Sequence, residues 1–185
     1  AVDELKLVGK HNVANALAAV AICSEIGPVG PEMIRAMTSF HGLEHRAETI
    51  AEIEGVSFIN DSKATNPGAS RASIEGLCSG RSGVLIAGGE HKGADFSDLA
   101  NTAVRHMHTV VLIGEASERI NRALKGRIAS LYATDLHAAV SAAARLARPG
   151  EVVLLSPGCA SFDMFDDYRH RGRVFRQAVE ELRVR

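Results

Sequence analysis

Short apolar runs alternate with helix-type segments through most of this 185-residue sequence, and this alternation limits the fold more than any other feature. The clearest runs are GVLIA at 83–87, TVVLI at 109–113 and EVVLL at 151–155. Such runs are typical of strands that are buried on both faces of a sheet. Repeated strand-then-helix units favour a mainly parallel sheet with helices on both faces. We therefore expect an α/β, Rossmann-like fold.

Weaker patterns complete this sheet region. The β-type runs at 49–53 and 56–60 flank Glu54-Gly55, which predicts a hairpin turn, and a weak strand is expected near 130–133. Asn66-Pro67 is typical of a helix start, and Asp135 is a candidate helix cap. Helices are expected at about 67–77, 97–107, 115–124 and 136–147, with a last one that ends near 182.

The first 41 residues have a different pattern. NVANALAAVAICSEI at 12–26 predicts an Ala-rich helix that Gly27 ends, and Pro31 begins a second helix that runs to about residue 40. Two helices without a strand do not begin a sheet domain. We therefore expect a boundary at HGLEHR, with 1–41 belonging to a neighbouring domain and 42–185 forming the sheet domain.

Composition narrows the class of partner. The sequence has 21 Lys and Arg residues and 22 Asp and Glu residues, which gives a net charge of −1. This balance disfavours a surface that binds nucleic acid or membranes, and it favours a small-molecule partner. Three cysteines without a C-x-x-C pair argue against a disulfide framework and a zinc site, which indicates a reducing compartment. No apolar run is long enough to span a membrane, and no signal-peptide core is visible at the start. We expect a soluble, cytoplasmic protein.

Three polar loops follow predicted strands, at 61–66, 88–95 and 156–163. Because the carboxyl ends of parallel strands open on one edge of the sheet, we expect these loops to face a common pocket. Cations and hydroxyls are the groups that hold a carboxylate or a phosphate, so a ligand of that kind is predicted. The loops supply both kinds of group in Ser62, Lys63, Thr65, Lys92, Ser156 and Ser161.

Other functions lack their motifs. GGEHKG at 88–93 is neither the dinucleotide fingerprint nor a P-loop, which disfavours a dinucleotide-dependent oxidoreductase. The eight histidines include no H-E-x-x-H, so no metal site is predicted. Cys159 and Ser161 lie outside a G-x-S-x-G elbow and give no sign of covalent catalysis. A non-catalytic binding module remains an alternative, as does an ordinary solvated loop for any single polar residue.

Five ordered segments resemble the Mur ligases of peptidoglycan synthesis, over nearly the whole chain. Members that add a diamino acid or D-alanyl-D-alanine tend to carry a D-Y-A-H-x-P-type loop where this chain has DSKATNP, so the resemblance points to the branch that adds D-glutamate. The matching segments are GKHNVANALAA at 9–19, GLEHR at 42–46, NDSKATN at 60–66, GGEHKG at 88–93 and LSPGCASFD at 155–163.

The resemblance implies an ATP-dependent ligase that activates a carboxylate as an acyl phosphate. Its substrates would be ATP, D-glutamate and UDP-N-acetylmuramoyl-L-alanine, with Mg needed in the complete, monomeric enzyme. Such ligases have three domains, and this chain resembles the tail of the central ATP-binding domain, to about residue 41, plus the whole carboxy-terminal domain. The P-loop, the carbamylated lysine and the magnesium ligands are missing from the sequence, so the chain alone is expected to be inactive.

The resemblance also implies roles for particular residues. Lys63 would lie near the transferring phosphate as the catalytic residue. His11 and Asn60 belong to the motifs, but helix capping or loop hydrogen bonding explains them better than ligand contact. The binding residues would be Thr65, Lys92, Ser161 and Tyr168 for D-glutamate, Asn12 and Asn15 for adenine, and Arg46 and Asp61 for the ribose and phosphate region.

Overall fold

The computed structural model describes residues 4, 10–40, 42–78 and 83–183, and the chain divides into two compact units, residues 1–43 and 44–185. The first unit contains α1 (Lys10–Ser24) and α2 (Pro31–Ser39), with Pro31 in the first turn of α2 as predicted. None of residues 12–40 is buried, and Ile26 is 86% exposed. This unit therefore has no enclosed core of its own in its described part.

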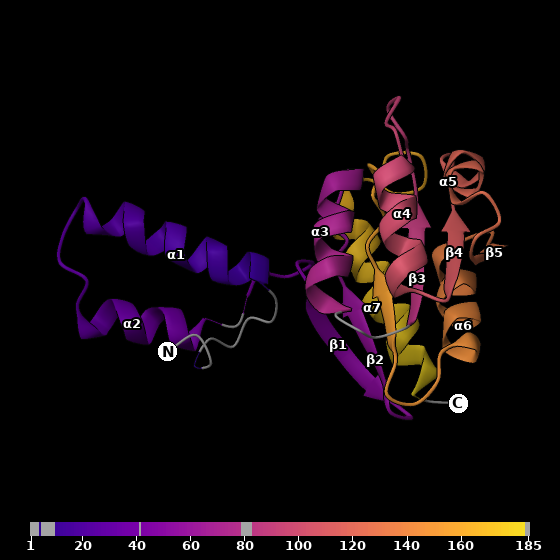
Figure 1. Cartoon of the computed structure of the whole chain (residues 1–185). Helices are drawn as coiled ribbons and strands as arrows, with labels where there is room; N and C mark the ends of the chain where they lie inside the picture. Colours follow the sequence, from indigo (N-terminus) through magenta and orange to yellow (C-terminus); the bar gives the residue numbers. More distant parts are fainter. Residues whose placement is uncertain (1–3, 5–9, 41, 79–82, 184–185) are drawn as a thin grey trace. The chain divides into compact units, whose positions relative to one another are not determined.

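The second unit contains a six-stranded sheet in the order β1-β2-β6-β3-β4-β5 (Figure 1). β1 pairs with β2 in antiparallel fashion through a turn in which Glu54 and Gly55 both have positive φ, and every other pairing is parallel. The predicted hairpin and mainly parallel sheet are thus confirmed. The strands are β1 (Glu48–Ile53), β2 (Val56–Asn60), β3 (Gly83–Gly88), β4 (Thr109–Ile113), β5 (Ala129–Tyr132) and β6 (Val152–Leu155).

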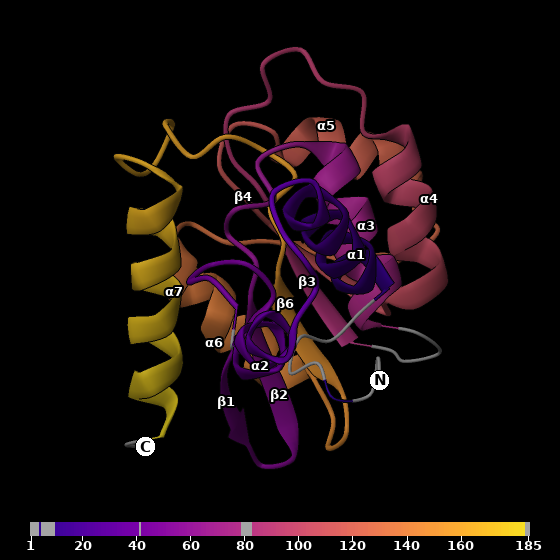
Figure 2. The ribbon, with the colours of Figure 1, turned by 90° about the vertical axis from the view of Figure 1, so that its left-hand side faces the viewer.

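Helices cover both faces of the sheet. Figures 1 and 2 show α7 on the opposite side of the sheet from α3 and α4. Each face has its own apolar cluster, and alternate strand residues point into each, so Leu85 joins one cluster and Ile86 the other. Strands buried on both faces explain the uninterrupted apolar runs in the sequence. The helices are α3 (Pro67–Leu77), α4 (Ser97–His106), α5 (Ser117–Leu124), α6 (Leu136–Leu146) and α7 (Tyr168–Leu182).

Side-chain caps begin three of these helices. The Asn66 Oδ1 accepts the Ala69 N–H at 2.9 Å at the start of α3, and Asp135 accepts the Ala138 N–H at 2.8 Å at the start of α6. The sequence predicted the Asp135 cap and a helix start at Asn66-Pro67. Asp167 caps α7 in the same way. Because caps satisfy orphan backbone N–H groups, each helix starts at a defined residue after its loop.

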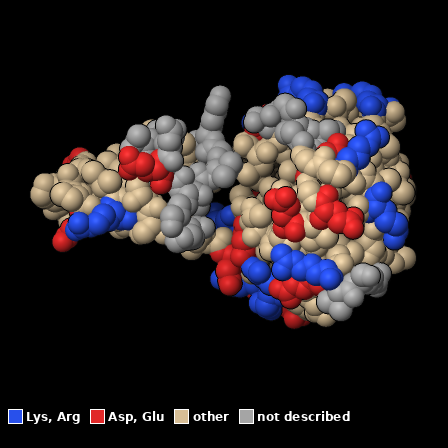
Figure 3. Space-filling view, turned by 90° about the horizontal axis from the view of Figure 1, so that it is seen from below, with Lys and Arg blue, Asp and Glu red and all other residues tan. Residues whose placement is uncertain are grey.

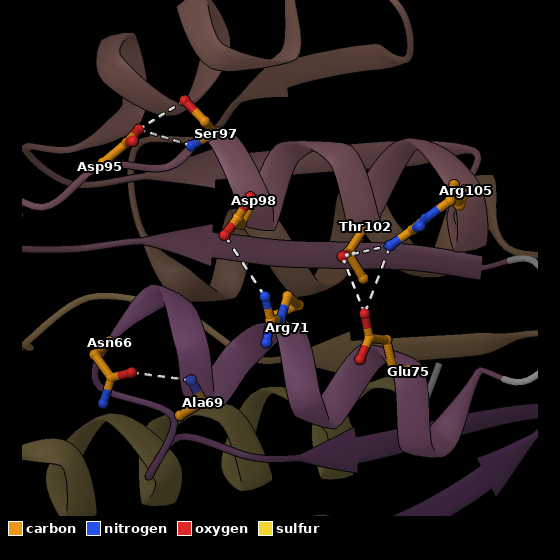
Figure 4. Close-up of polar contacts among 9 residues, drawn as sticks. All are labelled: Asn66, Ala69, Arg71, Glu75, Asp95, Ser97, Asp98, Thr102 and Arg105. Carbon is orange, nitrogen blue, oxygen red and sulfur yellow. Dashed lines mark hydrogen bonds and ion pairs between the residues drawn. The ribbon is translucent and has the colours of Figure 1, made fainter.

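Ion pairs on the outer surface join α3 to α4, as Figure 4 shows. Arg71 lies 3.5 Å from Asp98, and Arg105 lies 3.5 Å from Glu75. On the face drawn in Figure 3, basic and acidic side chains of the second unit likewise lie beside one another. Within the described residues, no helix has the length and apolar character needed to cross a membrane.

Candidate functional site

Three loops at one edge of the sheet form the candidate site. The β2 loop (61–66), the β3 loop (89–96) and the β6 loop (156–167) follow strands that lie side by side, with β6 between β2 and β3. These strands are parallel to one another, so all three loops leave the same edge. In Figure 1 the arrow of β3 points to this edge, and the β3 loop projects above it. The predicted meeting of the three loops is confirmed.

A cavity of about 290 Å³ lies between these loops. It brings together all five residues predicted to be catalytic or to bind D-glutamate. Its size suits a ligand as small as an amino acid better than a whole nucleotide. The lining residues are Lys63, Thr65, Lys92, Ala160, Ser161, Phe162, Asp167 and Tyr168.

Two ammonium groups lie against aromatic rings at the cavity. The Lys63 Nζ lies 4.1 Å from the centre of the Tyr168 ring, and the Lys92 Nζ lies 5.1 Å from that of Phe162. Such cation–π contacts orient a lysine without neutralising its charge. Both ammonium groups can therefore still attract an anionic ligand.

Two hydroxyl groups complete the polar lining. Ser161 is almost fully buried, and Thr65 is half-buried. Among the residues that the structure describes, neither side-chain hydroxyl forms a hydrogen bond. A hydroxyl without a partner in the protein is free to donate to a carboxylate oxygen of a ligand.

A buried arginine joins the β2 loop to the β6 loop. Arg171 has no exposed surface, and its Nε and Nη2 donate to the Oγ and carbonyl oxygen of Ser62 at 3.0 and 2.8 Å. Its Nη1 and Nη2 also donate to the Cys159 carbonyl oxygen, both at 3.1 Å, and Nη1 donates to Ala160 at 3.3 Å. Burial lowers the pKa of Arg171 to about 10, so it remains protonated at neutral pH.

The Cys159 thiol beside this arginine is not an activated nucleophile. It is 2% exposed, and burial raises its pKa to about 12. A thiolate is the reactive form of cysteine, and it is scarce when the pKa lies so far above neutral pH. Cys159 therefore acts as a packing residue, with its backbone carbonyl holding Arg171.

Asp61 has a structural environment that the sequence did not reveal. Its Oδ1 accepts the Ala47 N–H at 3.2 Å, its Oδ2 accepts the Ser156 hydroxyl at 3.0 Å, and the residue is 9% exposed.

Arg46, the other nucleotide-binding candidate of this unit, is exposed. Asn12 and Asn15 lie on α1 in the first unit, where Asn15 is exposed. The side chain of His11 lies outside the described part.

His45 and Asn60 fasten the start of the second unit to α7. The Asn60 Nδ2 lies 3.1 Å from the His45 Nδ1 and also donates to the Gly172 carbonyl oxygen at 3.1 Å. The Asn60 Oδ1 accepts the Ser62 N–H, so Asn60 makes the loop hydrogen bonds expected of it. Burial lowers the pKa of His45, while Glu48 opposes that shift. The neutral ring accepts from Asn60, and a protonated ring could not.

Arg171, Phe162 and Asp167 are the residues of this region that sequence reasoning missed. Arg171 lies on the buried face of α7, together with Phe175 and Val179. A charged residue at an apolar position of a helix indicates a buried group that needs polar partners, so the sequence did contain a sign of its role. Phe162 is 64% exposed and lies in a loop, where periodicity gives no information.

Comparison with known proteins agrees with this arrangement. The family model described as "Mur ligase, glutamate ligase domain" matches residues 45–159. The fold is a mainly parallel sheet, and the site is a polar cavity at the carboxyl ends of three neighbouring strands. The chain belongs to this Mur ligase family.

Particular relatives are proteins called UDP-N-acetylmuramoylalanine–D-glutamate ligase. The one from Pseudomonas fluorescens Pf0-1 is 48% identical over 183 residues, and that from Pseudomonas syringae pv. syringae B728a is 51% identical over the same length. Each match covers 98% of this chain but 41% of the relative. The chain thus spans about two fifths of the length of these curated relatives.

Solved structures share the fold at low sequence identity. The UDP-N-acetylmuramate-alanine ligase of Thermotoga maritima matches with a TM-score of 0.69 at 18% identity, over 96% of this chain and 39% of that one. A folylpolyglutamate synthase of Mycobacterium tuberculosis, complexed with ADP, matches with a TM-score of 0.68 at 18% identity, over 94% of this chain and 41% of that one.

Proposed function

We propose that this chain is the carboxy-terminal part of an ATP-dependent ligase that joins D-glutamate to UDP-N-acetylmuramoyl-L-alanine. The main support is the cavity, in which two lysines and two unpartnered hydroxyls face a space that suits an amino acid. The name of the relatives at 48% and 51% identity supports the same reaction. Residues 42–185 would be the D-glutamate-binding domain.

The cavity residues would divide the recognition of a dicarboxylate. Lys92, Thr65 and Ser161 would hold the carboxylates of D-glutamate, and Tyr168 would form the wall beside them. Lys63 would face the phosphate that is transferred from ATP to the carboxylate of the muramoyl-alanine substrate. The D-glutamate amine would then attack the acyl phosphate, and phosphate would leave from the tetrahedral intermediate. Such a reaction depends on positioning and charge neutralisation rather than on a protein nucleophile.

The nucleotide would be held only in part by this chain. Asn12 and Asn15 would contact adenine, and Arg46 and Asp61 would contact the ribose and phosphate region. Among the described residues, no group of three or more His, Cys, Asp or Glu side chains could hold a metal ion. The activity would therefore require the rest of the enzyme.

A Lys92→Ala substitution tests the amino-acid site. It would be made in an enzyme that joins this chain in cis to the amino-terminal portion of a relative. Charge-assisted hydrogen bonds contribute roughly 1.5 to 3 kcal/mol, so the KM for D-glutamate should rise about tenfold or more, with less change in the KM for ATP. Equal changes in both KM values would contradict the assignment of Lys92.

Lys125→Ala is the matched control for this substitution. Lys125 has a φ of 53° and Lys92 a φ of 45°, so both lysines occupy left-handed turns and both variants impose the same backbone change. Lys125 is exposed and is not among the residues that line the cavity. Its replacement should leave both KM values unaltered.

We further propose that residues 1–41 are the tail of the central ATP-binding domain. The exposure of Leu17, Ile22 and Ile26, at 65, 67 and 86%, supports this assignment, because such side chains are normally covered by a neighbouring structure. A chain lacking 1–41 should keep a single cooperative unfolding transition. A molten product would refute the boundary.

The chain on its own should hydrolyse no ATP. A phosphate-release assay on the purified chain checks this expectation, with an Asp61→Ala variant as the background control. Magnesium-dependent turnover clearly above that control would contradict the proposal that half of the active site lies in the missing portion.

A further inference from the structure

The main chain of Glu90 connects the two loops that carry the proposed carboxylate-binding groups. The Glu90 N–H donates to the Ala160 carbonyl oxygen at 3.0 Å, and the Ala160 N–H donates to the Glu90 carbonyl oxygen at 3.2 Å. Ala160 immediately precedes Ser161, and Glu90 lies two residues before Lys92. The bridge therefore fixes the distance between the backbone segments on which Lys92 and Ser161 depend.

The side chain of Glu90 faces Lys92. Its Oε2 is shielded from solvent and accepts no hydrogen bond from any described residue, but it lies 3.7 Å from the Lys92 Nζ. A shielded carboxylate oxygen is costly without a nearby cation, so Lys92 explains why Glu90 is tolerated there. Lys92 itself is 59% exposed at its side chain, with the Phe162 ring as its other contact.

We propose that Glu90 is a positioning residue for amino-acid recognition, which holds the Lys92 ammonium at the wall of the cavity. The inference rests on the proposed function, because that function assigns Lys92 to a carboxylate of D-glutamate. Glu90 is not among the cavity-lining residues, so it acts through Lys92 rather than by touching the ligand. A lysine side chain loses conformational entropy when it binds a ligand. An ion pair that already restricts the side chain in the free protein makes the entropy lost on binding smaller.

Glu90 also carries a negative charge, which would repel a ligand carboxylate if the two came close. The geometry favours positioning over repulsion, since Lys92 reaches the cavity and Glu90 does not. At 3.7 Å the ammonium is paired with Glu90 by charge without a short hydrogen bond, so its N–H donors remain available to a ligand. The two effects predict opposite changes in KM, which makes the inference testable.

The test is Glu90→Gln in the joined, full-length enzyme. Partly exposed ion pairs are weak, so the KM for D-glutamate should rise roughly two- to fivefold, with little change in kcat or in the KM for ATP. Glu90→Asp keeps the charge on a shorter side chain and should restore part of the loss. In a Lys92→Ala background, Glu90→Gln should have no further effect. Glu75→Gln, which removes a carboxylate paired with Arg105 instead, is the control and should change neither KM.

Several outcomes would overturn the inference. A KM for D-glutamate that is unchanged or lowered in Glu90→Gln would show that Glu90 does not position Lys92 for binding. A further rise in KM in the Lys92→Ala background would show that Glu90 acts by another route. A lowered melting temperature in Glu90→Gln would reduce its role to folding. A normal KM in Lys92→Ala itself would overturn the proposed function, and this inference with it.

Discussion

The two lysines of the cavity stand on loops that are fixed in different ways. The β2 loop, which carries Lys63, is held from inside by Arg171, whose guanidinium has no exposed surface. The β3 loop is bridged to the β6 loop by the main chain of Glu90, but around Lys92 its contacts lie near the surface, such as that of the His91 Nε2 with the Glu115 Oε1 at 2.9 Å. Buried contacts are worth more than exposed ones, so the Lys63 side should be rigid and the Lys92 side adjustable.

Replacing Arg171 should give the largest effect on stability. Arg171→Met leaves the carbonyl oxygens of Ser62 and Cys159 without their donors inside the protein. We expect a loss of about 3 kcal/mol in the free energy of unfolding, measured with urea. The control is Arg169→Met, on the same helix but exposed, which should change stability far less. Equal losses in the two variants would remove the distinction between the loops.

Asp61→Ala should rank second. It removes the acceptor of the Ala47 N–H and of the Ser156 hydroxyl inside the protein, with an expected loss of about 2 kcal/mol. Asp95 is a matched control, because it also accepts one backbone N–H and one hydroxyl, both from Ser97, but is exposed. Asp95→Ala should be much milder by the same urea titration. If it were not, burial would not be what distinguishes the two loops.

His45 should make the buried side sensitive to pH. Its folded pKa lies below the ordinary value of 6.5, so the unfolded chain takes up the proton first as the pH falls. The stability that this residue contributes is complete above pH 6.5 and is lost as the pH drops toward the folded pKa. His45→Asn keeps an acceptor for Asn60 and tolerates the φ of 65°, but cannot titrate. Unfolding curves of this variant should therefore depend less on pH below 6.5; an unchanged dependence would assign the effect to other groups.

His91→Ala should give the smallest change in stability. The His91 Nδ1 accepts the Gly93 N–H at 2.8 Å at the surface, so its loss should cost less than about 0.5 kcal/mol. Hydrogen exchange at Gly93 should nevertheless become faster, while exchange at Ser62 in the β2 loop stays unchanged. Equal acceleration in both loops would show that they open together.

The sequence was sufficient to predict the elements of the sheet domain and three of its edge loops. Uninterrupted apolar runs such as 109–113 and 83–87 are typical of strands in a sheet that helices cover on both faces. Asn66-Pro67 and Asp135 indicate where two of the helices begin. The strand order was not readable, because no local pattern states that β6 lies between β2 and β3. That order depends on contacts between residues that are far apart in the chain.

The candidate site was predictable where a motif carried it. Lys63, Thr65, Lys92 and Ser161 came from loop segments that resemble one family, and they meet in one cavity. The supporting residues were not predictable in the same way. Glu90 pairs with Lys92, two residues away, and its main chain bridges to Ala160. Arg171 donates hydrogen bonds to Ser62 and Cys159. No pattern in the sequence states these pairings, although a charged residue on the buried stripe of α7 did single out Arg171.

The position of β6 has a consequence for the order in which the domain can assemble. β6 is the last strand along the chain and yet is hydrogen-bonded on both sides, to β2 and to β3. During synthesis, β2 and β3 emerge long before the strand that lies between them, and closing so distant a contact is slow. In a nascent chain that ends before residue 152, β2 and β3, which precede the loops of Lys63 and Lys92, would lack the strand that pairs with both of them. Ribosome-stalled chains of increasing length should therefore gain protease resistance in one late step, after β6 and α7 have both emerged.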